Sequence, residues 1–275
     1  MTAENTTNKT ISFDEAKQLE LQILKYIDKT LKENGIPYWL DAGTLLGSVR
    51  HKGFIPWDDD IDLVIMRKDY DRAIEVLNNS SDRYKVLTMH NTEDYYYTFA
   101  KITDTHTHIV ERDWREIKSL GIYVDLFPLD YLPADDREFY RLANTVFALR
   151  AMVTFSMMDR GQFRRARLKQ KLEFLAGRLY GQKRALKKID KICAEYSASH
   201  PDTGVIADIV AANDRKVRIP AETFAKTLQG EFEGDLYPIP AGYDRFLRSY
   251  YGEYMELPPV EKRVSTHGFK AYWIR

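Results

Sequence analysis

An alternation of acidic and apolar residues at positions 60–63 constrains the fold of this chain more than any other feature. The four residues are Asp60, Ile61, Asp62 and Leu63. In a strand, alternate side chains share one face, so the two acids lie together and the two apolar residues enter a buried layer. Two carboxylates about 7 Å apart along a strand repel each other unless a cation lies between them. The pattern therefore predicts a buried strand with a site for a hard cation such as Mg²⁺.

A glycine and a serine precede this strand at a defined distance. Eleven residues separate the pair Gly47 and Ser48 from Asp60, and the pair follows a predicted strand over 37–42. Glycine allows close approach of the backbone to a phosphate, and a hydroxyl with the amides of a helix start binds its oxygens. An acidic run such as 58–60 is, by itself, more typical of a solvated turn. The combination is more specific and indicates a phosphate site beside a cation.

Composition excludes several classes of protein. The 275 residues carry 41 Lys or Arg and 41 Asp or Glu, a formal net charge of zero, whereas proteins dominated by nucleic-acid binding are strongly basic. The single cysteine, Cys193, excludes an internal disulfide and a cysteine-based zinc cluster and is typical of a reducing compartment. The N-terminus lacks the apolar stretch of a signal peptide, and the apolar tract at 145–158 is too short to span a bilayer. We therefore expect a cytoplasmic protein without a nucleic-acid partner.

The apolar periodicity divides the chain into two halves. Ser12 and Glu15 have capping-box spacing ahead of a helical apolar pattern. Residues 1–133 alternate helices and strands, and residues 134–275 are predicted to be mainly helical, with a mixed, proline-rich part from about residue 200; one integrated domain is the alternative. The main expected helices are 13–34, 43–51, 68–78, 136–158, 162–180 and 183–199, and the main expected strands are 37–42, 60–66, 84–90, 95–104, 108–114 and 121–127, the last ended by Pro128.

A strongly basic segment lies in the predicted helical half. Residues 160–191 contain twelve Lys or Arg and only two acids, Glu173 and Asp190, so the local charge is +10. One interpretation is a solvated helical face. The other is peripheral contact with an anionic membrane, at the inner face of the cell membrane, or with a polyanionic substrate, because each basic residue near an anionic surface contributes about 1 kcal/mol. The charge pattern leaves both interpretations open.

The acidic motif resembles a known superfamily. Gly47-Ser48, the gap and Asp60-Ile-Asp62-Leu match the signature of the nucleotidyltransferases that resemble DNA polymerase β. The longer strings LDAGTLLGSVR at 40–50 and FIPWDDDID at 54–62 are similar to the LicD family, which includes bacterial phosphocholine transferases and is related to the fukutin-type proteins. The resemblance spans about residues 20–267. Further segments similar to the family are 124–130, 251–255 and 257–259, with His267 following.

The resemblance implies a fold and a set of site residues. The fold is α+β, with a polymerase-β-like nucleotidyltransferase core (a mixed sheet with flanking helices) followed by the mainly helical part. Asp125 becomes the third carboxylate beside Asp60 and Asp62, and the alternative is that it caps the turn before Pro128. The three carboxylates would hold Mg²⁺, with Mn²⁺ as a substitute, and Asp125 would also take the proton of the acceptor hydroxyl.

The resemblance also implies the substrates. The donor is CDP-choline or a related CDP-alcohol, the acceptor is a sugar hydroxyl of a teichoic acid precursor or another glycan, free or lipid-linked, and CMP leaves. Besides the three aspartates, the candidate substrate-binding residues are Gly47, Ser48, Arg50, Trp57 and Lys101. Arg50 and Lys101 are expected at the diphosphate, with exposed surface cations as the alternative. Trp57 is expected to contact the quaternary ammonium.

Two other classes of function stay open. In the second interpretation, the same core transfers another alcohol phosphate, such as ribitol or glycerol phosphate, or a nucleotide. A non-catalytic protein that binds a polyanion through 160–191 is the third interpretation. Clustered repulsive carboxylates argue against it, because a binding module gains nothing from them.

Overall fold

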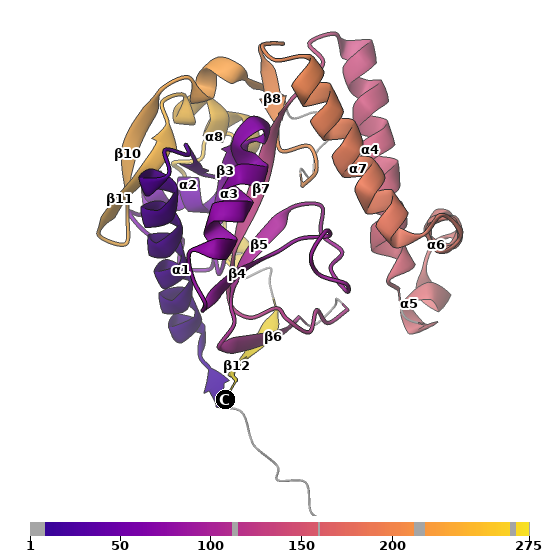
Figure 1. Ribbon diagram of the computed structural model, residues 1–275, viewed down its shortest axis with the longest axis horizontal. Coiled ribbons are helices and arrows are strands. Elements are labelled where there is room, and N and C mark those ends of the chain that lie inside the picture. Colours follow the sequence, from indigo (N-terminus) through magenta and orange to yellow (C-terminus); the bar gives the residue numbers. More distant parts are fainter. Residues whose placement is uncertain (1–8, 112–114, 159, 212–217, 265–267, 275) are drawn as a thin grey trace, which may run out of the picture.

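The computed structural model of the protein describes residues 9–111, 115–158, 160–211, 218–264 and 268–274. Helices pack around a curled central sheet (Figure 1), so the expected mixed sheet with flanking helices is confirmed. The helices are α1 (Phe13–Glu33), α2 (Ala42–Arg50), α3 (Arg67–Asn79), α4 (Asp136–Ser156), α5 (Arg160–Arg165), α6 (Leu168–Tyr180), α7 (Gln182–Ser199) and α8 (Tyr243–Tyr251). The strands are β1 (Thr10–Ile11), β2 (Trp39–Leu40), β3 (Asp62–Met66), β4 (Tyr84–Leu87), β5 (Ala100–Asp104), β6 (Thr107–Glu111), β7 (Tyr123–Tyr131), β8 (Val205–Ala207), β9 (Ile219–Pro220), β10 (Thr227–Phe232), β11 (Asp235–Pro240) and β12 (Phe269–Trp273).

The register of the central sheet positions the acidic motif. The strands lie in the order β2-β3-β7-β5-β4, and β8 joins β7 to β9. β3 and β7 run parallel, whereas the other pairings are antiparallel. Asp62 of β3 pairs with Asp125 of β7, and Lys101 of β5 pairs with the same Asp125. Three charged residues that are distant in the sequence therefore meet at one level of the sheet.

Helix α1 forms as its local signals predict. The Ser12 hydroxyl accepts a hydrogen bond from the Glu15 N–H at 3.2 Å, and the Glu15 carboxylate accepts one from the Ser12 N–H at 3.4 Å. These reciprocal bonds satisfy two donors that a helix start leaves unpaired. The apolar stripe that includes Ile23 and Ile27 is fully buried in the main core. The capping box and the helix are both confirmed.

Pro128 does not end a strand, contrary to expectation, because β7 runs through it to Tyr131. The Asp125 N–H bonds to Ile61 of the β3 side, so by alternation the nitrogen of Pro128 faces the opposite side. On that side β7 pairs with β5 only up to Leu126 and with β8 only from Asp130. Pro128 occupies the gap between these two partners, where no N–H is needed.

Helices α4, α6 and α7 form a layer beside the sheet (Figure 1). α4 and α7 pack together around a second apolar core, in which Phe139, Val146, Ile189 and Cys193 are buried. Cys193 is therefore a packed apolar residue, as its helical pattern suggests. The helix expected at 162–180 is wrong as one element, because α5 ends at Arg165 and α6 begins at Leu168.

The second half is mainly helical only as far as residue 199, and the part from about residue 200, expected to be mixed, contains strands. Five strands, β8 to β12, follow α7 among the described residues. β8 pairs with β7, and β12 lies between β1 and β6, so late strands complete sheets begun by early ones. Such pairings join segments that are far apart in the sequence, and no local pattern specifies them.

Four expected strands are shorter than the sequence pattern indicates. Those over 37–42 and 84–90 are reduced to Trp39–Leu40 and Tyr84–Leu87. The strand over 60–66 begins at Asp62, which leaves Asp60 in the preceding turn. The strand over 95–104 begins at Ala100, because the preceding tyrosines pack as an irregular aromatic cluster. The strand over 108–114 is Thr107–Glu111, and residues 112–114, including Trp114, lie outside the described residues. Within the described ranges, no helix has the length and apolarity needed to cross a bilayer.

A buried ion-pair network ties the helical layer to the sheet. The Arg67 guanidinium of α3 donates two hydrogen bonds to the Asp130 carboxylate of β7, at 2.7 and 2.8 Å, and one to Asp190 of α7 at 2.9 Å. The Asp130 side chain is fully buried. Burial raises the pKa of Asp130, and the Arg67 charge opposes that shift. The pair is costly to break, because either partner alone would leave an uncompensated buried charge.

We expect Asp130→Ala to lower the free energy of unfolding by about 3 kcal/mol, as for other broken buried pairs. The matched control is Glu195→Ala on α7, whose partner Lys191 lies 3.5 Å away and is exposed; it should cost less than about 1 kcal/mol. Urea titration followed by circular dichroism measures both. Equal stability losses in the two variants would contradict the assigned role of the network.

Candidate active site

The carboxylates of Asp62 and Asp125 meet where the parallel strands β3 and β7 lie side by side. The two residues are direct partners in the register, which places their Cα atoms about 4.8 Å apart. Their side chains are nearly buried, with 9% and 7% exposure. The Asp62 N–H donates to the Thr44 hydroxyl at 2.9 Å, and the Asp41 N–H donates to the Asp62 carbonyl at 2.9 Å. These bonds fix the start of β3 against the start of α2.

Electrostatic repulsion dominates this site. Burial raises the pKa of Asp62 well above its usual range, and the charges of Asp60, Asp125, Asp41 and Asp58 raise it further. A carboxylate in this environment is favoured as an anion only when a cation neutralises it. The donor set consists of carboxylate oxygens, which fits a hard divalent cation and does not fit a soft one.

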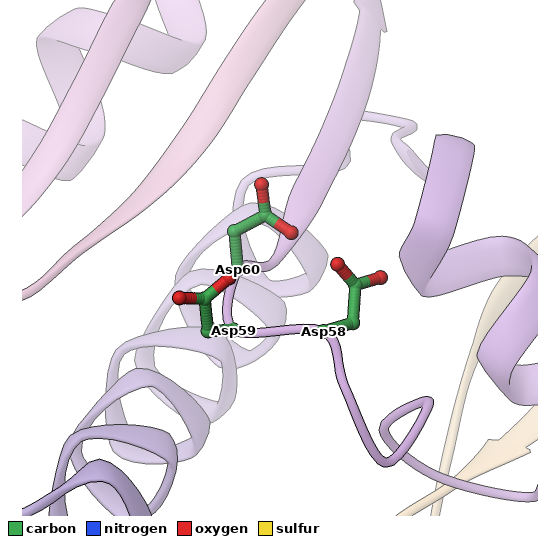
Figure 2. Close-up of side chains that lie close together, drawn as sticks. All are labelled: Asp58, Asp59 and Asp60. Atoms are coloured by element: carbon green, nitrogen blue, oxygen red, sulfur yellow. The ribbon is translucent and has the colours of Figure 1, made fainter. Parts of the chain in front are cut away.

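The turn that precedes β3 adds a compact acidic cluster (Figure 2). Asp58, Asp59 and Asp60 each offer a carboxylate oxygen, and these oxygens lie within 4.8 Å of one another. Figure 2 shows the three carboxylates rising from one short turn, with those of Asp58 and Asp60 pointing to the same side of it. Asp59 is buried at 5% exposure, so the alternative of a solvated turn does not hold for it. Asp60, the predicted ligand, lies in this turn, and its assignment to the site stays a prediction; Asp58 is a further carboxylate beside it that the sequence pattern did not single out.

Gly43 lies against one acid of this turn. The Asp58 carboxylate packs so closely on Gly43, in the first turn of α2, that a Cβ at this position would clash with it. The start of a helix carries partial positive charge and favours an anion. Gly43 therefore lets the acidic turn approach the N-terminus of α2.

Gly47 and Ser48 pack against protein in this structure. Gly47 leaves no room for a Cβ beside the Gly53 carbonyl, so its close approach is to the chain itself. Ser48 is buried at 1% exposure, and its hydroxyl faces Gly230 of β10. That hydroxyl has no hydrogen-bond partner among the described residues. The assignment of Gly47 and Ser48 to phosphate binding stays a prediction.

Lys101 is a buried partner of Asp125, so the alternative of a surface cation is wrong. Its ammonium lies 2.6 Å from the Asp125 Oδ1 and is 2% exposed. The rings of Tyr123, Tyr97 and Phe99 surround it at 3.6, 4.5 and 5.3 Å. Aromatic faces stabilise a desolvated cation. Lys101 therefore supplies the positive charge next to Asp125 and helps to fix the position of this carboxylate.

Arg50 and Trp57 contact the C-terminal segment. The Arg50 guanidinium donates to the carbonyls of Tyr254 and Glu256, the latter at 3.2 Å. The Trp57 ring lies 5.7 Å from the Arg263 guanidinium, a cation–π contact. These contacts bring the 251–263 segment to the site, as the family resemblance of that segment implies. Their predicted roles at the diphosphate and the ammonium stay predictions, and His267 lies outside the described residues.

Glu20 of α1 is a site residue that sequence reasoning missed. The side chain is 4% exposed, and its Oε2 has no hydrogen-bond partner among the described residues. Burial raises the pKa of Glu20 well above its usual range, and the charges of Asp60 and Asp59 add to the shift. The available signal is its place in the helix: Glu20 falls on the apolar stripe with Ile23 and Ile27, where an acid is unexpected.

A second acidic pair lies beside the motif. Burial and the charge of Asp208 raise the pKa of Asp41 to about 8. Burial raises the pKa of Asp208 to about 6, against the hydrogen bond from the Tyr250 hydroxyl at 3.3 Å. Burial raises the pKa of the Tyr251 hydroxyl, and the negative charges of Asp41 and Asp62 raise it further. Asp41 belongs to the segment at 40–50 that resembles the LicD family. Asp208 follows the short strand β8 and lies in none of the motifs found in the sequence.

A cavity of about 330 Å³ adjoins Lys101. Tyr97 and Phe99, two of the rings around the Lys101 ammonium, line it, and Arg150 of α4 lines it from the opposite side. The Phe99 ring also contacts Phe127 of β7 at 4.4 Å. The cavity therefore lies between the segment that precedes β5 and helix α4.

We expect the unfolding free energy of the metal-free protein to fall as pH rises. An unfolded aspartate ionises near pH 3.9, whereas Asp208 keeps its proton to about pH 6. The folded state binds more protons in that interval, so stability decreases across it, and the raised pKa of Asp41, about 8, continues the decrease above it. Asp208→Asn should remove the part of this loss that Asp208 causes and raise stability at pH 7.5 by about 3 kcal/mol.

Chemical denaturation in EDTA between pH 4 and 8 tests this expectation. Asp71→Asn, at an exposed position of α3, is the control and should follow the wild type. An unchanged pH profile in Asp208→Asn would show that Asp208 ionises normally in the folded protein.

Comparison with known proteins agrees with the geometry. A family model described as "LicD/FKTN/FKRP, nucleotidyltransferase domain" matches residues 35–159. The chain is 30% identical to the lipopolysaccharide cholinephosphotransferase LicD of Haemophilus influenzae, over 96% of its own length and 99% of that protein. Shorter segments match two mammalian proteins. Identity is 42% over 67 residues with the ribitol-5-phosphate transferase FKTN of Mus musculus, covering 24% of this chain and 14% of that protein. It is 47% over 45 residues with the ribitol 5-phosphate transferase FKRP of Homo sapiens, covering 16% and 9%.

The chain is an enzyme of the phosphotransferase class. It carries paired carboxylates on a mixed sheet, and its relatives are named as alcohol-phosphate transferases. The match along almost the whole length of LicD is the decisive one. The chain belongs to the LicD family. The resemblance that the motifs at 40–62 indicate is thereby confirmed.

Proposed function

We propose that the protein transfers phosphocholine from CDP-choline to a sugar hydroxyl of a cell-surface glycan and releases CMP. The observation that carries the proposal is the full-length similarity to a lipopolysaccharide cholinephosphotransferase, joined to the juxtaposed Asp62 and Asp125. We extend the proposal to a polymerase-β-like nucleotidyltransferase core and to a teichoic acid precursor, free or lipid-linked, as acceptor. We place the reaction in the cytoplasm.

Mg²⁺ is the proposed cofactor, with Mn²⁺ as a substitute. Asp60, Asp62 and Asp125 would hold the ion, and their oxygen donors and mutual repulsion fit a divalent cation. When bound, the ion supplies positive charge against the charge that develops on the transferred phosphoryl group. Asp58, on the same side of the turn as Asp60, adds to the negative charge that favours binding.

In the proposed reaction the acceptor hydroxyl attacks the phosphorus that bears choline. A new bond forms from the sugar oxygen to phosphorus, the bond from phosphorus to the CMP oxygen breaks, and the hydroxyl proton passes to Asp125. Lys101, at 2.6 Å, orients the Asp125 carboxylate and favours its anionic form before the transfer. Lys101 thus acts as a positioning residue.

The test of this function is CMP release from a panel of CDP-alcohols. Purified protein, Mg²⁺ and a glycan acceptor should give CMP from CDP-choline in preference to CDP-ribitol and CDP-glycerol. EDTA should abolish the release, and Mg²⁺ or Mn²⁺ should restore it. Preference for CDP-ribitol would favour the second candidate, a ribitol phosphate transferase, which the FKTN and FKRP matches support. Full turnover in metal-stripped protein would contradict the proposed cofactor.

Substitution of the carboxylates tests the site itself. We expect Asp60→Asn, Asp62→Asn and Asp125→Asn each to lower kcat at least ~100-fold, because each removes a charge worth several kcal/mol in the transition state. Asp71→Asn, exposed on α3, is the control for the same chemical change. Circular dichroism should show unchanged folds. Turnover within a few-fold of wild type in any variant would remove that residue from the site.

A further inference from the structure

Helix α6 presents four exposed leucines on one face. Leu168, Leu172, Leu175 and Leu179 recur at spacings of four, three and four residues. With 3.6 residues per turn they fall within an arc of roughly 60°. Their exposures are 74%, 59%, 50% and 87%. A row of exposed leucines on a protein surface is unusual and marks a binding face.

The opposite side of α6 is fixed against the protein. Gly177 lies about 180° around the helix from Leu168, is buried, and packs so closely on the Met152 carbonyl of α4 that a Cβ would not fit. This contact sets the rotation of α6 about its axis. The leucines therefore face away from the protein because of the packing, and Figure 1 shows α6 at the outer edge of the helical layer.

Basic residues flank the leucines on both sides. Around the helix, Lys169 lies about 100° to one side of Leu168, and Lys171 and Arg178 lie about 60–80° to the other. The neighbouring helices add exposed basic residues, namely Arg164, Arg165, Lys183, Arg184, Lys187 and Lys188. Only two acids occur in 160–191. An apolar stripe between two basic borders is the pattern of a helix that lies in a membrane interface.

We propose that α6 binds an anionic membrane surface, with its leucines in the headgroup–acyl boundary and its Lys and Arg on lipid phosphates. The local charge of +10 selects an anionic bilayer as the occupant. The same charge opposes a second copy of the chain on this face, because two such surfaces repel each other. At 13 residues the helix is too short to span a bilayer. The proposal is independent of which alcohol phosphate the enzyme transfers.

Vesicle co-sedimentation of the full chain tests the proposal. The probes are vesicles of phosphatidylcholine mixed with phosphatidylglycerol, and vesicles of phosphatidylcholine alone. Wild type should bind the anionic vesicles, and more weakly at high salt, because exposed charges are screened. Changing Leu168, Leu172, Leu175 and Leu179 together to Gln should weaken binding at least tenfold. The control pair Leu228→Gln and Leu236→Gln, exposed at 46% and 59% on β10 and β11, should bind as wild type.

A second variant separates charge from apolar contact and guards against misfolding. Lys169→Gln, Lys171→Gln and Arg178→Gln keep the leucines and should also weaken binding to anionic vesicles by at least fivefold. Circular dichroism and CMP release with a soluble acceptor should stay at wild-type levels in both variants.

Unchanged vesicle binding in the leucine variant would overturn the proposal, and so would equal binding to neutral and anionic vesicles. Sedimentation velocity tests the other possible occupant of this face, a second copy of the chain. A wild-type dimer that becomes monomeric in the leucine variant, without vesicle binding by either, would make this face a contact between copies and overturn the membrane assignment.

Discussion

Parallel pairing of β3 with β7 is the constraint on which the rest of the structure depends. It places two nearly buried carboxylates, Asp62 and Asp125, at adjacent positions of one sheet. Like charges in such an environment destabilise the folded state, since each pKa that burial raises is free energy lost at neutral pH. The buried ammonium of Lys101, which lies beside Asp125 among aromatic rings, compensates part of this negative charge. The remaining repulsion is what makes the site suited to a divalent cation.

Segments from both ends of the chain complete this site. Helix α1 contributes the buried Glu20, and the segment after α8 reaches back to the carbonyl contacts of Arg50 and the Trp57 ring. Between them, the turn before β3 brings Asp58 to the start of α2. The acidic centre is therefore enclosed by elements that lie near opposite ends of the sequence. A local change in the C-terminal segment can alter the site without touching a carboxylate.

Local signals predicted the parts of this arrangement that local physics determines. The capping box at Ser12, the helical stripe of α1 and the pairing of acidic and apolar residues around Asp62 all follow from near neighbours in sequence. The family strings identified Asp125, whose side chain alone does not distinguish a ligand from a cap. Burial of Lys101 was not predictable, because it depends on which strands and aromatic rings cover it, whereas the position of Glu20 on the apolar stripe of α1 does indicate burial. The strands after residue 199 were missed for the same reason: β8 and β12 gain their hydrogen bonds from β7, β1 and β6, all in the first half of the chain, and from the late strand β9.

Pro128 separates two groups of hydrogen bonds along one edge of β7, those to β5 and those to β8. On one side of Pro128 the strand is held by β5, with the Tyr70 hydroxyl bridging the Leu126 carbonyl and the Ala100 N–H, each at 2.7 Å. On the other side it is held by β8, which has few pairs. Because no ladder bond forms at Pro128 on this edge, the hydrogen bonds of β8 to β7 are separate from those of β5, although the side chains of Ile206 and Ala207 are buried in the two cores. β8 has only two pairs with β7, whereas β3 lies between two strands, β2 and β7. We therefore expect the amide hydrogens of β8 to exchange with solvent before those of β3, while the strands that carry the carboxylates keep their register.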